Sequence, residues 1–489
     1  MGELGRFTRN SFFLAISYAL RFAAGVLVTV FVGKHLAKED FGRLSFALTL
    51  SIFFGTLADF GLPALTTRDV AQDRSLAARY YRNIIVLKAL LAIAGFLAIV
   101  AYMHFLGYPA ETRAVVYPVT AYMLIASLGT YHYFVFRGLE RMHLEAAAAI
   151  VNNAALIICV GAALGPRVIL SGHDVNVPVG RVAAGYLVAG VVSTMLVFAL
   201  FGRTLGGVRP GFDFALWKRL LKKATMFALY GFFGLIYMYV DTLMIEKLRN
   251  SQTEVASYQA PVKLLTAAVM VLAVIINVYL PMLSRRYRAS VEDFRSLVHT
   301  LNHLGLAIIV PIAAFSFVYA REILVFAYKP EYGDSAVILQ VLTVGFLAWY
   351  GPPYAVVFLA MDRQAVTFHV SAVCAVVNFV LNWTFIPGYG PIAAAATTLA
   401  TYVLMKALYM VYCRKYLGST FVDTRYLTTA LLCAAIAFAL KQTGLHVVPA
   451  GALFCAIYAA GCYLLLLSRG ERKLCTRLLG TLTGREAAA

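Results

Sequence analysis

The stretch NIIVLKALLAIAGFLAIVAYMHFL, residues 83–106, decides the fold, because Lys88 is its only charged side chain. A hydrocarbon core of about 30 Å is crossed by a helix of roughly 20 apolar residues, so this run is long enough to span a bilayer. The chain as a whole is similar, with 61% hydrophobic and 13% charged residues among 489 and a mean hydropathy of +0.79. A water-soluble fold could not bury that much apolar surface. We therefore expect an all-α polytopic membrane protein.

Fourteen stretches of this kind occur along the chain, separated by short polar loops. The thirteenth is shorter than a usual bilayer crossing. The predicted spans are residues 12–33, 42–65, 83–106, 114–136, 145–165, 182–202, 224–246, 258–283, 301–320, 336–360, 366–387, 391–413, 427–440 and 449–468. The sequence therefore predicts about 14 transmembrane helices.

The positions of Lys and Arg predict the orientation, because basic loops stay on the cytoplasmic side. With the N-terminus inside, the inner segments hold 27 of the 42 basic residues and the outer loops hold 10. Both termini should therefore be cytoplasmic. The net charge of +19 then reflects topology and attraction to anionic lipid headgroups, and we expect no nucleic-acid partner.

The seven cysteines predict neither disulfides nor a metal site. They lie in predicted spans or in the inner tail, without a CxxC motif or a paired external spacing. We expect no cofactor. The sequence also lacks a GxxxxGK[ST] loop, which disfavours a primary pump.

A basic loop at residues 203–223 divides the chain into six spans before it and eight after it. Apolar and basic residues alternate there in a pattern that suits a helix lying in the headgroup plane. We predict two six-helix bundles, residues 1–202 and 224–413, around a central cavity. The loop joins them as an interfacial connector, and residues 414–489 add two transmembrane helices and a cytoplasmic tail.

Short matched motifs indicate that the two bundles are related. FRGLER at 136–141 resembles FLAMDR at 358–363, and DFGLP at 59–63 resembles NVYLP at 277–281. The motifs of each pair run in the same direction through the membrane, so the repeat is parallel, with its axis along the membrane normal. Duplicated bundles around a cavity that opens to each side in turn are a transporter architecture.

Local signals also predict where helices begin and break. Ser290, with Asp293 three residues later, predicts a capped interfacial helix that leads into the span at 301–320. Pro311 and the Gly-Pro-Pro run at 351–353 predict interruptions of the ninth and tenth spans.

Four motifs carry a family resemblance: DFG at 40–42, DFGL at 59–62, DTLMI at 241–245 and VASYQA at 255–260. With them the chain resembles the lipid-linked oligosaccharide flippases, or polysaccharide transporters, of the multidrug/oligosaccharidyl-lipid/polysaccharide exporter superfamily. The family usually has Gly where Ala256 stands.

The resemblance implies an alternating-access, antiporter-like protein of the bacterial cytoplasmic membrane. Its implied substrate is an isoprenoid-pyrophosphate-linked oligosaccharide, moved from the cytoplasmic to the outer leaflet for cell-surface polysaccharide synthesis. It also implies a coupling ion, either a proton or sodium, and a polysaccharide polymerase as a partner.

Charges inside spans are functional candidates, because an ionised group at the bilayer centre is costly. Arg21 is the deepest, about 14 Å into the first span at 1.5 Å per residue. Residues 17, 21, 25, 29 and 33 give this helix a small, polar face. A guanidinium fork matches phosphate oxygens, so Arg21 is a candidate for binding pyrophosphate. The alternative is a structural ion pair.

Three lysines could also line a substrate-binding cavity. Lys263 lies five residues into the eighth span, while Lys88 and Lys406 lie near the inner ends of the third and twelfth spans. The alternative is that each snorkels to the interface.

Acidic and amide groups are the candidates for coupling or gating. Asp241 either exchanges a proton or sodium ion or pairs with a cation such as Lys263. Asp59 suits a hinge or gate, paired with a nearby arginine. Asn277 shares a helix face with Lys263 and matches Asp59 in the repeat.

Two other classes remain open. A drug or small-cation exporter of the same superfamily has an acidic cavity as a rule, whereas basic residues outnumber acidic ones within these spans. A membrane glycosyltransferase or polymerase could use the acidic pair Glu39 and Asp40 to hold a metal. That pair lies in a very short external loop, which leaves little room for an acceptor site. We therefore expect a transporter and no enzyme.

Overall fold

The computed structural model describes residues 24–165, 177–205, 210–349, 354–421 and 425–461. Within these ranges every regular element is a helix, which confirms the all-α prediction. A first helix covers Ala24–His35. Arg21 and residues 350–353, where a break was predicted, lie outside the described residues.

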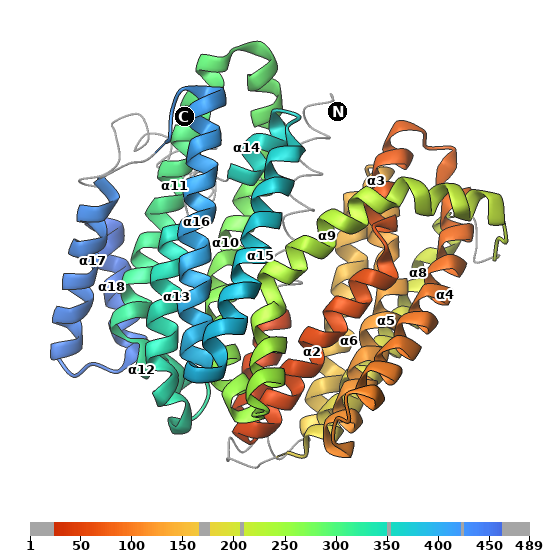
Figure 1. The fold of residues 1–489 in the computed structure, drawn as a ribbon. Helices are drawn as coiled ribbons and strands as arrows, with labels where there is room; N and C mark the ends of the chain where they lie inside the picture. The colour runs from red at the N-terminus through yellow and green to blue at the C-terminus, as the bar shows by residue number, and fades with distance from the viewer. Residues whose placement is uncertain (1–23, 166–176, 206–209, 350–353, 422–424, 462–489) are drawn as a thin grey trace, which may run out of the picture.

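The N-terminal half forms one side of the molecule, coloured red to yellow in Figure 1. Here α5 packs against α2 and α8, and α8 packs against α6. The elements are α2 Lys38–Asp59, α3 Leu62–Gln72, α4 Leu76–Phe105, α5 Ala110–Gly138, α6 Met142–Leu164, α8 Val179–Phe201 and the 3-10 turn η1 Gly202–Leu205.

The C-terminal half lies beside it, coloured green to blue. Its elements are α10 Gln252–Ala289, α11 Val291–Val318, α12 Ala320–Ala327, η2 Pro330–Ser335, α13 Ala336–Trp349, α14 Tyr354–Ala360, α15 Gln364–Tyr389 and α16 Pro391–Leu417. Two further helices, α17 Arg425–Gln442 and α18 Val447–Gly461, pack against α11 at the far edge. The predicted division at residues 202, 223 and 413 is retained as a proposal.

One long helix, α9 Phe214–Arg249, joins the halves. It bends by 55° between Ile236 and Met238, and its first arm lies across one end of the N-terminal half (Figure 1). The predicted connector helix is therefore not a separate element, because its last residues form the start of α9. Trp217 and Leu220, in this first arm of α9, are buried and pack against residues of the N-terminal half.

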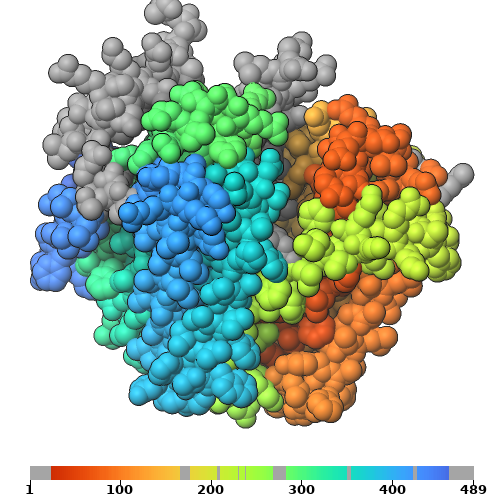
Figure 2. All heavy atoms as spheres, turned by 45° about the horizontal axis from the view of Figure 1, so that its top comes forward, coloured from red at the N-terminus to blue at the C-terminus, as the bar shows by residue number. Residues whose placement is uncertain are grey.

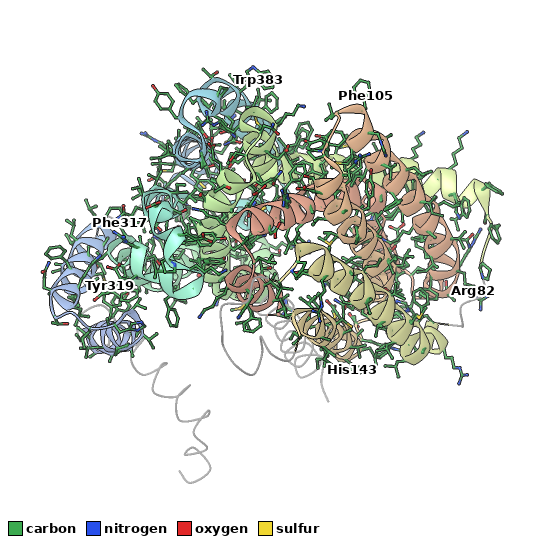
Figure 3. The ribbon with its side chains drawn as sticks, turned by 90° about the horizontal axis from the view of Figure 1, so that it is seen from below. Arg82, Phe105, His143, Phe317, Tyr319 and Trp383 are labelled. Atoms are coloured by element: carbon green, nitrogen blue, oxygen red, sulfur yellow. The ribbon has the colours of Figure 1, made fainter. Side chains whose placement is uncertain are left out.

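Apart from the span at 42–65, each predicted span lies largely on helix where the structure describes it. In the described ranges, nine helices are long and apolar enough to cross a membrane, or ten with the bent α9. The count of fourteen therefore stays a prediction. Large apolar side chains lie at the perimeter, including Phe105, Phe317 and Trp383 at 91%, 41% and 59% exposure (Figure 3). Such a belt suits contact with lipid.

The span predicted at 42–65 is not one helix. It ends at Asp59, and Phe60 and Gly61 adopt φ angles of 45° and 69° before α3 begins. A Cβ on Gly61 would lie 2.7 Å from the backbone nitrogen of Ala228 in α9, so the turn requires glycine. In contrast, α11 continues through Pro311, and the predicted interruption there is wrong.

The predicted cap at the start of α11 is confirmed, because the Ser290 side chain accepts a hydrogen bond from the Asp293 amide at 3.3 Å. This helix continues directly into the ninth span as one element.

One predicted repeat motif has the same backbone in both halves. Glu140 and Asp362 both have φ of 58°. In 136–141 and in 358–363, the amide of the final arginine donates to the carbonyl of the first phenylalanine at 2.8 Å. Both motifs therefore end a helix with the same left-handed cap. The other pair differs, because α10 is continuous through 277–281 whereas the chain breaks at Phe60 and Gly61.

Candidate functional site

A buried carboxylate, Asp241, lies on the second arm of α9 where four helices meet. The side chain is 3% exposed. Its Oδ2 accepts hydrogen bonds from the Tyr258 hydroxyl of α10 at 2.6 Å and from the Thr398 hydroxyl of α16 at 2.7 Å. The Asn382 amide of α15 donates to Oδ1. Both oxygens are therefore held by neutral donors.

A second layer of neutral groups surrounds this carboxylate. Asn382 also donates to the Asn378 side-chain oxygen at 3.0 Å, and the Thr397 hydroxyl donates to Asn382 Oδ1. Asn378 donates to Thr401 at 3.4 Å. All four side chains are buried. We name Asp241, Tyr258, Asn378, Asn382, Thr397, Thr398 and Thr401 the Asp241 cluster.

No described cation neutralises Asp241. The ion pairs among the described residues do not include it, so the predicted alternative pairing with Lys263 is not formed there. In the same part of the chain, no group of three or more His, Cys, Asp or Glu side chains could hold a metal ion.

Sequence reasoning selected Asp241 but missed most of its partners. Of these partners only Tyr258 lay in a predicted motif, the family motif at 255–260. Asn378 and Asn382 are four residues apart in an apolar helix, as are Thr397 and Thr401. Such spacing places polar groups on one face, and this was the available signal.

Two other predicted residues, Asp59 and Lys88, form an ion pair with each other. The predicted arginine partner of Asp59 is thus a lysine. Ser127 of α5 accepts from Lys88 at 2.7 Å and donates to Asp59 at 2.6 Å, and the ammonium lies 5.9 Å from the ring centroid of Tyr131. Lys88 is 2% exposed and does not snorkel. The pair sits where α2 ends, at the turn described above.

The structure does not place the remaining predicted site residues in one site. Lys263 is half-buried on α10 and has no hydrogen bond or ion pair with a described residue. Lys406 is half-buried in the second half of α16. Asn277 lies within α10, where only the backbone is described, and Arg21 is outside the described ranges.

The two halves meet closely at the end opposite the first arm of α9. Lys38 donates to the Glu331 carbonyl at 2.9 Å, and Lys329 donates to the Leu36 carbonyl at 3.0 Å. A Cβ on Gly42 would lie 1.8 Å from the backbone oxygen of Gln252.

A buried hydrogen bond joins the halves at the same end. The Tyr108 hydroxyl, from the N-terminal half, donates to Glu246 at the end of α9 at 2.6 Å. Glu246 is 3% exposed and was not selected from the sequence. At the opposite end, Figure 2 shows the surface hollowed between the two halves. The molecule is therefore closed at one end of the interface between its halves.

Two helical halves, closed together at one end, with buried polar clusters inside an apolar exterior, define a multi-pass membrane protein of the transporter class. The family model described as "Polysaccharide biosynthesis protein" matches residues 7–286. The chain belongs to this family.

Several solved structures share this fold. A lipid II flippase, MurJ, in an inward closed conformation is 15% identical, with a TM-score of 0.69 over 94% of this chain and 99% of that one. An inward-facing multidrug resistance MATE family transporter of the MOP superfamily is 14% identical, with a TM-score of 0.62 over 83% and 94%. A MOP superfamily transporter from Pyrococcus furiosus is 12% identical, with a TM-score of 0.57 over 86% and 96%. A search of curated proteins finds no match.

The structural similarities confirm the predicted all-helical, polytopic fold class, and the family match confirms the predicted relation to polysaccharide transporters. At such low identity the structures show the fold alone, and the family match supplies the link to polysaccharide biosynthesis.

Proposed function

We propose that the protein is an alternating-access flippase. It moves an isoprenoid-pyrophosphate-linked oligosaccharide from the cytoplasmic to the outer leaflet of a bacterial cytoplasmic membrane, with both termini in the cytoplasm, and it performs no chemical step. The observation that carries this proposal is the family match to polysaccharide biosynthesis proteins, in a chain with the fold of a lipid II flippase. A polysaccharide polymerase would receive the product.

Closure at one end supports an alternating mechanism. The lysine-to-carbonyl contacts and the Tyr108–Glu246 hydrogen bond join the halves at the end that the charge distribution assigns to the outside. Transport to the outer leaflet requires these contacts to break while the opposite end closes. Asp59 and Asn277 are our candidates for gating, because Asp59 pairs with Lys88 at the turn between α2 and α3.

Asp241 is the proposed coupling group. An ionised carboxylate in a buried site needs compensation, and its three neutral donors supply only part of it. Two of the donors are hydroxyls, which can rotate to present oxygen lone pairs to a cation. Either a proton or sodium would therefore complete the site.

Arg21, Lys263, Lys88 and Lys406 are the proposed substrate-binding residues, because cations are needed to hold a pyrophosphate inside a membrane protein. Arg21→Ala should abolish binding of a pyrophosphate-lipid headgroup, and Arg21→Lys should retain part of it, since a point charge remains but the fork is lost. Unchanged headgroup affinity in a destabilised Arg21→Ala protein would assign Arg21 to a structural ion pair.

The direct test is deletion of the gene, followed by identification of the lipid-linked saccharide that accumulates on the inner leaflet. Complementation with Asp241→Asn should fail, whereas Asp334→Asn, an exposed carboxylate on η2, serves as the matched control and should restore export. Transport in proteoliposomes, with sodium and pH gradients imposed separately, identifies the coupling ion.

The alternative is export of a drug or small cation, which the fold shared with MATE transporters favours. In that case the deletion strain would accumulate no lipid-linked saccharide, and it would become sensitive to cationic compounds.

A further inference from the structure

The first arm of α9 has one face that packs on protein. Leu216, Trp217, Leu220 and Ala224 are buried and belong to one apolar cluster with residues of α3 and α4. This apolar face is therefore not the part of the helix that is free to contact a membrane.

Polar contacts fix the arm in this orientation. The Asp213 side chain caps the helix by accepting from the Leu216 amide at 2.9 Å, and Arg79 of α4 donates to the same carboxylate at 2.8 Å. The ammonium of Lys223 lies 3.8 Å from Asp69 of α3. The outward face of the arm is thus set by the N-terminal half and cannot rotate freely.

The outward face combines cations with exposed apolar side chains. Lys218, Arg219 and Lys222 are exposed, and among the described residues none of them forms an ion pair. Phe214 and Met226, on the same face, are 71% and 72% exposed. Phe214, Lys218 and Lys222 recur every four residues, so they form a row along the helix.

This face contains no opposing charge of its own. The sequence has no acidic residue between Asp213 and Asp241. A face of clustered cations with apolar side chains among them matches the boundary between phosphate headgroups and acyl chains. The exposed side chains of Phe214 and Met226 are more favourably placed among acyl chains than in water.

We infer that this outward face of α9, formed by Lys218, Arg219 and Lys222 with Phe214 and Met226, binds the headgroups of anionic phospholipids in the inner leaflet. The bound lipids hold the first arm of α9 at the membrane surface, and through it the end of the molecule where the surface is hollowed. This binding does not depend on which substrate the protein carries.

The test uses the purified full-length chain in bilayers of phosphatidylcholine. Spin-labelled phosphatidylglycerol and spin-labelled phosphatidylcholine report the relative affinity of the protein surface for the anionic lipid. Each basic residue near an anionic surface contributes about a fivefold preference. The triple variant Lys218→Gln/Arg219→Gln/Lys222→Gln should therefore lose at least fivefold of the preference at low salt.

A matched control separates a local site from net charge. Arg288→Gln/Arg414→Gln/Lys415→Gln removes three exposed cations from the C-terminal half, at the ends of α10 and α16. This variant should lose less than twofold of the preference. All six side chains are exposed, so both variants should remain monodisperse in size-exclusion chromatography.

Two results would overturn the inference. Equal losses in the two triple variants would mean that net charge attracts the lipid, without a site on α9. An unchanged preference in the α9 variant would exclude phospholipid as the ligand and leave the face to solvent or to an acidic protein.

Discussion

The ion pair of Asp59 and Lys88 gives the sharpest energetic prediction, because its partners are buried to different degrees. Lys88 is 2% exposed, whereas 34% of the Asp59 side chain is exposed. In Asp59→Asn the ammonium stays buried beside Ser127 and the ring of Tyr131, with no formal counter-charge. Stranding a buried charge in this way costs roughly 3 to 5 kcal/mol of unfolding free energy.

Removing the lysine instead should lower the unfolding free energy by less. In Lys88→Met the apolar side chain fills a similar volume, and the Asp59 carboxylate that remains is partly in contact with solvent and still accepts from Ser127. We expect a loss of about 1 kcal/mol, because a partly solvated partner tolerates the loss of its counter-ion. The unfolding free energy of the double variant Asp59→Asn/Lys88→Met should be close to that of Lys88→Met and higher than that of Asp59→Asn.

The assay is equilibrium unfolding of the purified chain in mixed detergent and sodium dodecyl sulfate micelles, with the three variants measured beside the parent protein. The coupling free energy from the double-mutant cycle gives the pair's contribution. Equal losses in the two single variants, or a double variant less stable than either, would refute the argument from unequal burial.

Three further predictions concern the halves, the orientation and the connector. Gly42→Ala should separate the halves at their closed end, because a Cβ there would lie 1.8 Å from a carbonyl oxygen of α10; an unchanged distance distribution between spin labels on the two halves would contradict this. Ser75→Cys should react with impermeant reagents only in inverted vesicles and Ala110→Cys only in spheroplasts, and the opposite labelling would reverse the orientation. The guanidinium of Arg79 holds the pKa of Asp213 below its usual value, so the carboxylate stabilises the start of α9 above about pH 4 and this stability is lost as the pH falls through the lower, folded-state pKa. Amide hydrogen exchange at the start of α9, corrected for intrinsic rates, should become faster at low pH in the parent protein. The Asp213→Asn variant should not show this pH-dependent loss of protection.

Local features of the chain could be predicted because they depend on neighbouring residues. The helix cap at Ser290 follows from a side chain and an amide three residues apart, and the structure has this contact at 3.3 Å. The paired turns at 136–141 and 358–363 likewise have the same φ of 58° at Glu140 and Asp362. Both are short-range features, so their residue patterns carry enough information.

Breaks in helices were harder to predict. Pro311 is tolerated within α11, whereas the break at Phe60 and Gly61 contains no proline and instead meets the backbone of α9. Local signals for this break are present, because Gly61 adopts a positive φ and Pro63 lies in the first turn of α3. The contact of Gly61 with α9 depends on the position of a neighbouring helix and could not be predicted from the sequence. For the same reason the connector merged with the seventh span into one bent helix.

The sequence by itself determined that this protein lies in a membrane, that it is helical, and which charges lie inside the spans, because composition and run length suffice for those conclusions. Only the tertiary structure decided which residues bind those charged groups. Asp241 is bound by Asn382, which is 141 residues away, and Lys88 pairs with Asp59 across two helices. An isolated charge in a span is costly wherever it lies, so the sequence marks it as a candidate. The partner that compensates it is set by helix packing, which depends on contacts between residues far apart in the chain.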